Sequence, residues 1–269
     1  MPTEEARQVM SRMINFYDEL LQLDLEEEAL KISKPGEDAL QQWLSGTPLI
    51  KCHLPTINTS FFLQLMDKVK DLIVSYQPER QEELSKIIDA LRDDVQMQQS
   101  LAAGLFNLDQ QSIYSIAAQW GVAVEQLELL LNHTLKLFLQ RYAQRVAPFL
   151  DLKYWDSGIC PVCGNVAHLA RLEKETGKRF LYCSLCDTEW PFKRVACPRC
   201  LNENQKDLQY FTVDGQEKYR VYTCAKCKGY IKTVDERKMG GKTVDMFRED
   251  LQTIHLDLLA RQEGYNVIS

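Results

Sequence analysis

Cysteine is the residue type in this sequence that is best suited to binding chemistry. Eight of the nine cysteines lie between positions 160 and 227, where they form four C-x-x-C pairs. Thiolates are preferred ligands of zinc and iron, and the two-residue spacing lets both sulfurs of a pair reach one ion. We therefore expect this stretch to bind metal through Cys160, Cys163, Cys183, Cys186, Cys197, Cys200, Cys224 and Cys227.

The intervals between the pairs indicate how the eight cysteines divide. Nineteen residues separate Cys163 from Cys183, and 23 separate Cys200 from Cys224. Each interval is typical of a β-hairpin, with strands expected over 167–172 and 179–182 and over 208–213 and 219–222. A hairpin with one pair near its start and another near its end brings four thiolates together. The spacing thus favours sequential sites, Cys160, Cys163, Cys183 and Cys186 in the first and Cys197, Cys200, Cys224 and Cys227 in the second, with interleaved pairing as the alternative.

Each site is expected to hold one metal ion, as in tandem zinc-ribbon or rubredoxin-like modules. Four thiolates suit Zn(II) and a rubredoxin-type iron equally well, so both metals stay open. The hairpins contain few large apolar residues, and a structural zinc site contributes about 10 to 16 kcal/mol in small peptides. We therefore expect the metal to decide whether this half of the chain folds.

The distribution of charge argues against nucleic-acid binding. Residues 1–156 contain 14 basic and 23 acidic side chains, and residues 157–269 contain 18 and 15. The stretch 116–127 resembles a helix-turn-helix, but residues 122–135, which would form the recognition helix, contain no lysine or arginine. Such a helix needs basic and amide side chains to reach phosphates and base edges. We expect no nucleic-acid partner.

The sequence favours a cytoplasmic protein with no membrane insertion. The first five residues are acidic rather than basic, and the most apolar run, 127–139, is too short and too polar for a bilayer. In a reducing compartment, paired cysteines are metal ligands or redox dithiols rather than disulfides. The four histidines are scattered, and no catalytic triad or phosphate-binding glycine loop is present, so no catalytic residue is expected.

The fold class expected is multidomain α plus small β. Apolar residues recur at helical spacing over residues 1–150, which predicts an all-helical bundle domain. Cys52 and His53 lie in a loop expected over 46–55, where Cys52 is expected to be structural. Residues 3–32 are predicted to form one long helix or two in line, with Thr3 as N-cap. Further helices are predicted over about 40–44, 58–77, 78–91, 95–106, 111–120 and 124–146.

After the bundle we expect a short packed linker over 151–158. The first four-cysteine ribbon is predicted over 159–194 and the second over 195–242. Gly240 and Gly241 mark a break before a final helix over about 243–263, within a C-terminal segment 243–269 that packs back on the ribbons or the bundle.

The sequence around the cysteine pairs resembles that of a known family. The matching motifs are Cys160 to Gly164, Lys178 to Cys186, Trp190, Arg194, Cys197 to Cys200, Tyr219 to Cys224, Cys227, Gly229 to Thr233, Leu256 to Ala260, and Gly264 with Tyr265. As a set, these motifs of residues 158–265 are similar to the formate dehydrogenase accessory protein family, FdhE. The helical half agrees with the family in size and type.

The resemblance implies a cytoplasmic assembly factor that has no turnover of its own. Members of the family bind the molybdenum- or tungsten-pterin catalytic subunit of a formate dehydrogenase and help it become active. The family's metal has been linked with rubredoxin-type iron. Two alternatives from other functional classes are a zinc-ribbon regulator that binds nucleic acid and a rubredoxin-like electron carrier.

Overall fold

The computed structural model describes residues 4–23, 25–240 and 244–266. The chain divides into two compact units, Met1–Ser33 with Leu54–Arg145, and Lys34–His53 with Val146–Ser269. Thr3, Gly241 and Thr243, which the sequence predicts to cap, break or begin helices, lie outside the described residues. The fold class expected from the sequence, a helical N-terminal region followed by a sheet with two four-cysteine clusters, is confirmed.

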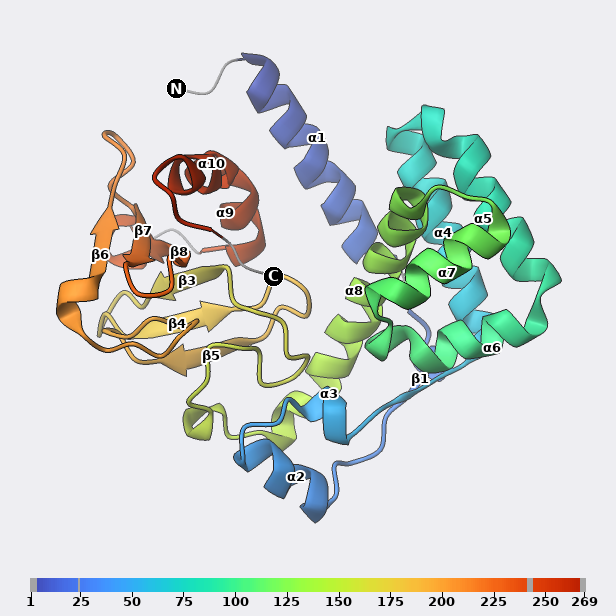
Figure 1. Ribbon diagram of the computed structural model, residues 1–269, viewed down its shortest axis with the longest axis horizontal. Helices are drawn as coiled ribbons and strands as arrows, with labels where there is room; N and C mark the ends of the chain where they lie inside the picture. Colours follow the sequence, from blue (N-terminus) through green and yellow to red (C-terminus); the bar gives the residue numbers. More distant parts are fainter. Residues whose placement is uncertain (1–3, 24, 241–243, 267–269) are drawn as a thin grey trace. The chain divides into compact units, whose positions relative to one another are not determined.

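The first unit is helical, as its apolar periodicity predicts. Three of its helices begin at an N-cap side chain, because Asn58, Asp94 and Asp109 accept backbone N–H groups of the following turn. The helices are α1 (Glu4–Leu21), α4 (Thr59–Tyr76), α5 (Gln81–Asp93), α6 (Val95–Gly104), α7 (Gln110–Trp120) and α8 (Val124–Val146) (Figure 1). Their buried faces form a core that includes Phe62, Met66, Ile73, Leu84, Ile87, Ile88, Phe138 and Tyr142.

The prediction of one helix or two in line over 3–32 is wrong in its second part. Helix α1 ends at Leu21, and the short strand β1 (Leu30–Lys31) pairs antiparallel with β2 (Thr56–Ile57). Between α1 and β1, Glu27–Ala29 form a single 3-10 turn and no continuing α-helix. The strand pair instead buries Ala29, Leu30 and Ile57.

Residues 34–53 leave the helical unit and belong to the second one. They contain α2 (Glu37–Leu44) and the short α3 (Leu49–Cys52), which occupies part of the stretch predicted as a loop. The continuous helical domain expected over 1–150 is therefore interrupted. The expected linker 151–158 is packed, and its Trp155 is 3% exposed.

The second unit is built on one six-stranded sheet with the strand order β5-β4-β3-β8-β7-β6 (Figure 1). Both predicted hairpins are present, as β3 with β4 and as β6 with β7. Each gains a third strand that the sequence analysis did not predict, β5 and β8. The strands are β3 (Leu169–Leu172), β4 (Arg179–Tyr182), β5 (Glu189–Phe192), β6 (Leu208–Phe211), β7 (Tyr219–Cys224) and β8 (Tyr230–Asp235).

A parallel pair joins the two expected ribbons into this single sheet. Strand β3 lies beside β8, with Leu169 opposite Lys232 and Leu172 opposite Asp235. The two four-cysteine modules are thus halves of one structural unit rather than independent domains.

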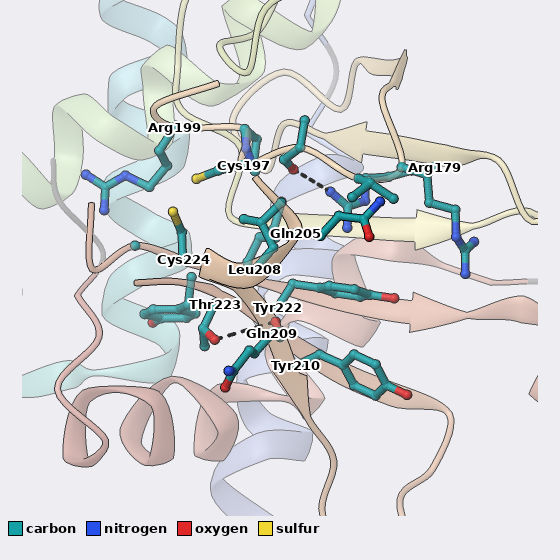
Figure 2. A pocket seen from close by; sticks show the side chains of 17 residues that line it. Arg179, Cys197, Arg199, Gln205, Leu208, Gln209, Tyr210, Tyr222, Thr223 and Cys224 are labelled. Carbon is teal, nitrogen blue, oxygen red and sulfur yellow. Dashed lines mark hydrogen bonds between the residues drawn. The ribbon is translucent and has the colours of Figure 1, made fainter. Parts of the chain in front are cut away.

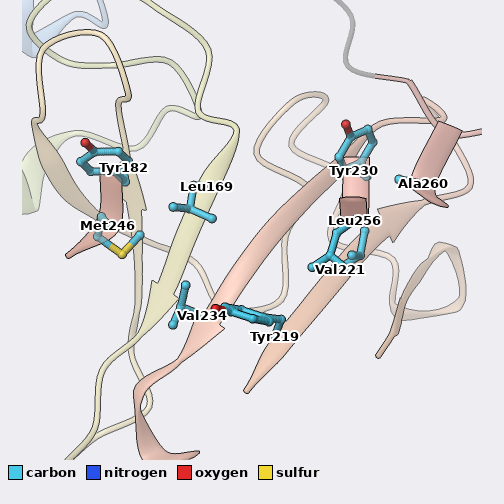
Figure 3. Packing of buried hydrophobic residues seen from close by; sticks show 9 residues of the cluster. All are labelled: Leu169, Tyr182, Tyr219, Val221, Tyr230, Val234, Met246, Leu256 and Ala260. Atoms are coloured by element: carbon cyan, nitrogen blue, oxygen red, sulfur yellow. The ribbon is translucent and has the colours of Figure 1, made fainter. Parts of the chain in front are cut away.

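The final helix predicted over 243–263 is two helices, α9 (Met246–Gln252) and α10 (Ile254–Gln262). Between them lies Thr253, whose buried hydroxyl donates a 2.7 Å hydrogen bond to the carbonyl of Glu249. Because successive strand residues point to opposite faces, alternate positions of the sheet meet these helices. Figure 3 shows this core, formed by Leu169, Tyr182, Tyr219, Val221, Tyr230 and Val234 with Met246, Leu256 and Ala260.

Buried ion pairs fix the helices on the sheet. Lys232, whose side chain is 3% exposed, forms salt bridges of 2.8 Å with Asp250 and 2.7 Å with Asp257. The hydroxyl of Tyr230 also donates to Asp257, at 2.9 Å. The C-terminal segment therefore packs on the ribbon sheet, one of the two positions expected for it.

Candidate metal centres

The four C-x-x-C pairs adopt the same turn. In each, the N–H of the first cysteine donates to the carbonyl five residues later, over 2.8 Å at Cys160, 3.0 Å at Cys183, 2.9 Å at Cys197 and 2.9 Å at Cys224. The residue after the second cysteine has a left-handed conformation in every case, with φ of 79° at Gly164, 59° at Asp187, 55° at Leu201 and 55° at Lys228. Only the first of these is a glycine, the residue that tolerates such angles without cost.

The first set of sulfurs consists of Cys160, Cys163, Cys183 and Cys186, which all lie within 4.8 Å of one another. The Sγ atoms of Cys160 and Cys186 are 3.5 Å apart, and so are those of Cys163 and Cys183. Four sulfurs at about 2.3 Å from a tetrahedral ion would be about 3.8 Å apart. The donor set and its spacing therefore fit one zinc or iron ion.

The second set consists of Cys197, Cys200, Cys224 and Cys227, again within 4.8 Å of one another. The Sγ distances are 3.6 Å between Cys197 and Cys227 and 3.7 Å between Cys200 and Cys224. The structure thus groups the cysteines sequentially, and not in the interleaved arrangement. That these eight side chains bind metal remains a prediction that the geometry supports.

The neighbourhood of the sulfurs controls the charge of each set. Hydrogen bonds from Cys160, Cys163 and Cys186 hold the pKa of Cys183 well below its ordinary value. The pKa of Cys186 is raised by its own hydrogen bonds with Cys160, Cys163 and Cys183. Burial raises the pKa of Cys224, but hydrogen bonds from the N–H groups of Cys227 and Lys226 and from the side chains of Asn202 and Cys200 together lower this pKa to about 7. The first proton of a set leaves readily and the last is retained, so four thiolates need a cation between them.

Two asparagines at the clusters were missed by the sequence analysis. The amide of Asn165 lies 4.0 Å from the sulfur of Cys183, and that of Asn202 lies 3.9 Å from the sulfur of Cys224. Both stand two residues after the leading pair of their module, so the repeated pattern C-P-x-C-x-N was the available signal. These amides support thiolate at the facing pair.

Residues 34–53 brace the first pair. The N–H of Leu49 donates to the carbonyl of Pro161 and that of Ile50 to the carbonyl of Val162, both at 2.9 Å. The indole N–H of Trp43 also donates to Pro161, at 3.1 Å, and its ring stacks on Trp155 at 5.5 Å between centroids. We name residues 34–53 the strap, since they hold the peptide between Cys160 and Cys163.

The second module is held by the end of the described chain. The N–H of Asn266 donates to the carbonyl of Lys228 at 2.8 Å, and Arg199 donates to the carbonyl of Asn266 at 2.9 Å. The Arg199 side chain also lies where a Cβ at Gly229 would stand, 2.4 Å from its Cδ. These contacts tie the pairs of the second set to the end of the helical layer.

Cys52 belongs to neither set. Its thiol lies 3.4 Å from the carbonyl of Leu49 and 3.5 Å from that of Ala39, and burial raises its pKa. That Cys52 has a structural role remains a prediction. Among the described ranges of the chain, no helix is long and apolar enough to cross a membrane.

Comparisons with known proteins agree on one family for the cysteine-rich region. Two family models match, "FdhE, central domain" over residues 159–194 and "FdhE, C-terminal domain" over residues 195–269. A "Protein FdhE homolog" of Aquifex aeolicus is 32% identical over 167 residues, which are 60% of this chain and 58% of the relative. One from Klebsiella pneumoniae subsp. pneumoniae is 26% identical over 254 residues, 93% of this chain and 73% of the relative.

The fold has a counterpart among solved structures, the crystal structure of the FdhE protein from Pseudomonas aeruginosa. The TM-score is 0.59 with 20% sequence identity, and the match covers 96% of this chain and 85% of that one. The chain spans 58%, 49% and 61% of the relatives from Aquifex aeolicus, Edwardsiella ictaluri and Cronobacter sakazakii. The resemblance predicted from the cysteine motifs is confirmed.

Proposed function

We propose that this chain, whose residues 159–269 match the FdhE central and C-terminal domains, is an accessory factor for a formate dehydrogenase. In this role it binds the molybdenum- or tungsten-pterin catalytic subunit in the cytoplasm and supports its maturation, without catalysing a reaction of its own. The observation that carries the proposal is that the matched residues, 159–269, contain both four-cysteine sets and the sheet that joins them.

The eight cysteines are proposed to hold one zinc or iron ion in each set. Zinc would hold the turns in place, and iron would in addition accept and donate one electron. The protein supplies paired sulfurs, N–H groups directed at them and a buried setting for Cys160, Cys183 and Cys186. These features serve a fixed binding surface as well as an electron-transfer site.

The test is capture of the natural partner. Tagged full-length protein, purified without oxygen from the organism that encodes it, is expected to bring down a formate dehydrogenase catalytic subunit. The variant Cys197→Ser is expected to recover less of that subunit, whereas Cys52→Ser, which alters a cysteine outside both sets, is expected to recover as much as the wild type. Recovery of unrelated proteins alone, by wild type and variants alike, would contradict the proposal.

A rubredoxin-like electron carrier is the second candidate, favoured by the half-buried cysteines Cys163, Cys200 and Cys227. Partial exposure of a sulfur shortens the path for an electron to a docked partner. This function requires iron with a reversible potential. Metal analysis and voltammetry of protein from its own host decide it, because zinc in both sets removes the candidate.

A further inference from the structure

A cavity of about 370 Å³ lies beside the second four-cysteine set (Figure 2). Its walls include Tyr222 of β7, Ile231 of β8 and the segment 194–199. Since Val221 and Val234 face α9 and α10, strand alternation directs Tyr222 and Ile231 to the opposite face of the sheet. The cavity therefore belongs to the sheet face that the C-terminal helices do not cover.

Three arginines line the cavity, and each donates to a neutral backbone carbonyl. Arg179 donates to Ala196 at 3.0 Å, Arg194 to Gly177, and Arg199 to Asn266 at 2.9 Å. Of the described residues that line the cavity, none is an aspartate or a glutamate. The wall therefore carries positive charge without a carboxylate to balance it.

Arg179 is the most constrained of the three. It is 2% exposed, and its Nε has no hydrogen-bond partner among the described residues. The guanidinium lies 4.7 Å from the ring centroid of Tyr222, and burial followed by the like charge of Arg194 lowers its pKa. A buried cation without a counter-ion is strongly disfavoured, so this end of the cavity favours an anion.

The second four-cysteine set, next to the cavity, supplies charge of the opposite sign. Four thiolates around one divalent ion retain two negative charges. Figure 2 shows Arg199 on the side of Cys197 and Cys224, whereas Arg179 lies on the other side, above Tyr222 and Tyr210. The charge of Cys197 also acts on Arg179. Arg194 lines the cavity and donates to the neutral carbonyl of Gly177, so its charge remains available to another anion.

The remaining walls suit an apolar or aromatic body. Tyr210, Leu208 and Ile231 line the cavity with Tyr222, and Gln205 adds an amide beside the arginine end. Tyr210 is 53% exposed, with its ring 5.3 Å from that of Tyr222 and the Arg220 guanidinium 4.9 Å from its centroid. Small-molecule sites commonly have volumes of about 300 to 1,000 Å³ and apolar walls with a few polar groups.

We propose that this cavity binds a small organic oxyanion, a carboxylate or phosphate on an aromatic body. The oxyanion lies against Arg179 and Arg194, because guanidinium groups match the geometry of carboxylate and phosphate oxygens. The aromatic body lies against Tyr222 and Tyr210. This binding site goes beyond the accessory role, which calls for no small ligand.

Titration of the full-length, metal-loaded protein with phenyl phosphate, benzoate and inorganic phosphate tests the proposal by calorimetry. We expect at least one aryl probe to bind at one site per chain and inorganic phosphate to bind more weakly. Arg194 is exposed and its loss should not disturb folding. Arg194→Gln is expected to weaken aryl binding about tenfold, the effect of one charge-assisted hydrogen bond.

Lys193→Gln is the matched control, because Lys193 is the exposed neighbour and pairs with Asp156 and Glu203 instead. It should bind the aryl probe within about twofold of the wild type. Tyr222→Leu tests the aromatic wall and should also weaken the aryl probe, with metal content unchanged in all three variants. Preference for phenyl phosphate or for benzoate identifies the oxyanion.

Two results would overturn the proposal. They are absence of saturable binding of both aryl probes at millimolar concentration, and equal weakening of binding by Lys193→Gln and Arg194→Gln. Inorganic phosphate that binds as tightly as phenyl phosphate would overturn the assignment of the aromatic body.

Discussion

At the residue scale, the cysteine turns depend on a conformation that the sequence only partly reveals. Gly164, the residue after its pair, has φ of 79°, which glycine adopts without steric cost. Asp187, Leu201 and Lys228 adopt the same left-handed conformation without being glycine. A side chain in this region is disfavoured by contact between its Cβ and the following carbonyl oxygen, so residue type alone did not predict it.

Leu201→Gly is expected to stabilise the second four-cysteine set. Leu201 is 53% exposed, so removing its side chain loses little packing. Glycine relieves the strain of the left-handed conformation but has more freedom in the unfolded chain, which offsets part of the gain. The net gain in folding free energy is about 0.5 to 1 kcal/mol. The rate of metal release to a chelator should fall accordingly. Leu201→Ala keeps the strain and serves as control, and equal slowing by alanine would contradict the explanation.

His133 makes the helical unit sensitive to acid. Its ring lies 5.1 Å from that of Phe16, and burial, with the charge of Lys136, lowers its pKa to about 4. An unfolded histidine titrates near 6.5, so between these values the unfolded chain binds more protons than the folded one. The free energy of unfolding therefore has its full value above about pH 6.5. It falls by up to about 3 kcal/mol as the pH decreases to about 4.

Urea unfolding at pH 7 and pH 5, followed by the helical circular dichroism signal, measures this dependence. His133→Phe should show a smaller difference between the two pH values than the wild type does, because the titrating group is gone. A variant with the wild-type difference would assign the acid sensitivity to other groups.

At the element scale, local patterns were predicted and distant pairings were not. Both hairpins follow from alternation and turn residues close in sequence. Strand β5 was not predicted, and its sequence gives little signal, because Pro191 within a short run argues against a strand. The pairing of β3 with β8 joins segments about 60 residues apart, and the strap binds backbone carbonyls of the first pair. Neither interaction has a signature in local composition.

The strap leads to a prediction for one site alone. Trp43→Phe removes the indole donor to Pro161 and part of the stacking on Trp155. We expect the first four-cysteine set to lose about 1 to 2 kcal/mol of metal-bound stability, roughly tenfold in metal release, with the second set unchanged. The release of cobalt from both sites is followed by its absorption, and one phase should be about tenfold faster than in the wild type while the other is unchanged. Trp120→Phe in α7 is the control. Equal loss from both sets would contradict a specific brace.

At the scale of the whole molecule, two complete donor sets share one sheet. Cys183→Ser removes a ligand of the first set and leaves all four of the second, so metal analysis should fall from two ions per chain to one. Cys52→Ser, which alters the cysteine outside both sets, should keep two. Loss of both ions from Cys183→Ser would mean that the β3 and β8 pairing makes the modules interdependent.

Metal removal is expected to unfold the sheet unit while the helical unit stays folded. The helical unit has its own core, which includes Phe62, Phe138 and Tyr142, whereas the hairpins of the sheet unit depend on their four-cysteine sets. Three of the four tryptophans, Trp43, Trp155 and Trp190, belong to the sheet unit. A strong chelator should therefore shift tryptophan emission to the red while much of the helical circular dichroism persists, and added zinc should reverse the shift. Simultaneous loss of both signals would show that the helical unit cannot stand without the metal.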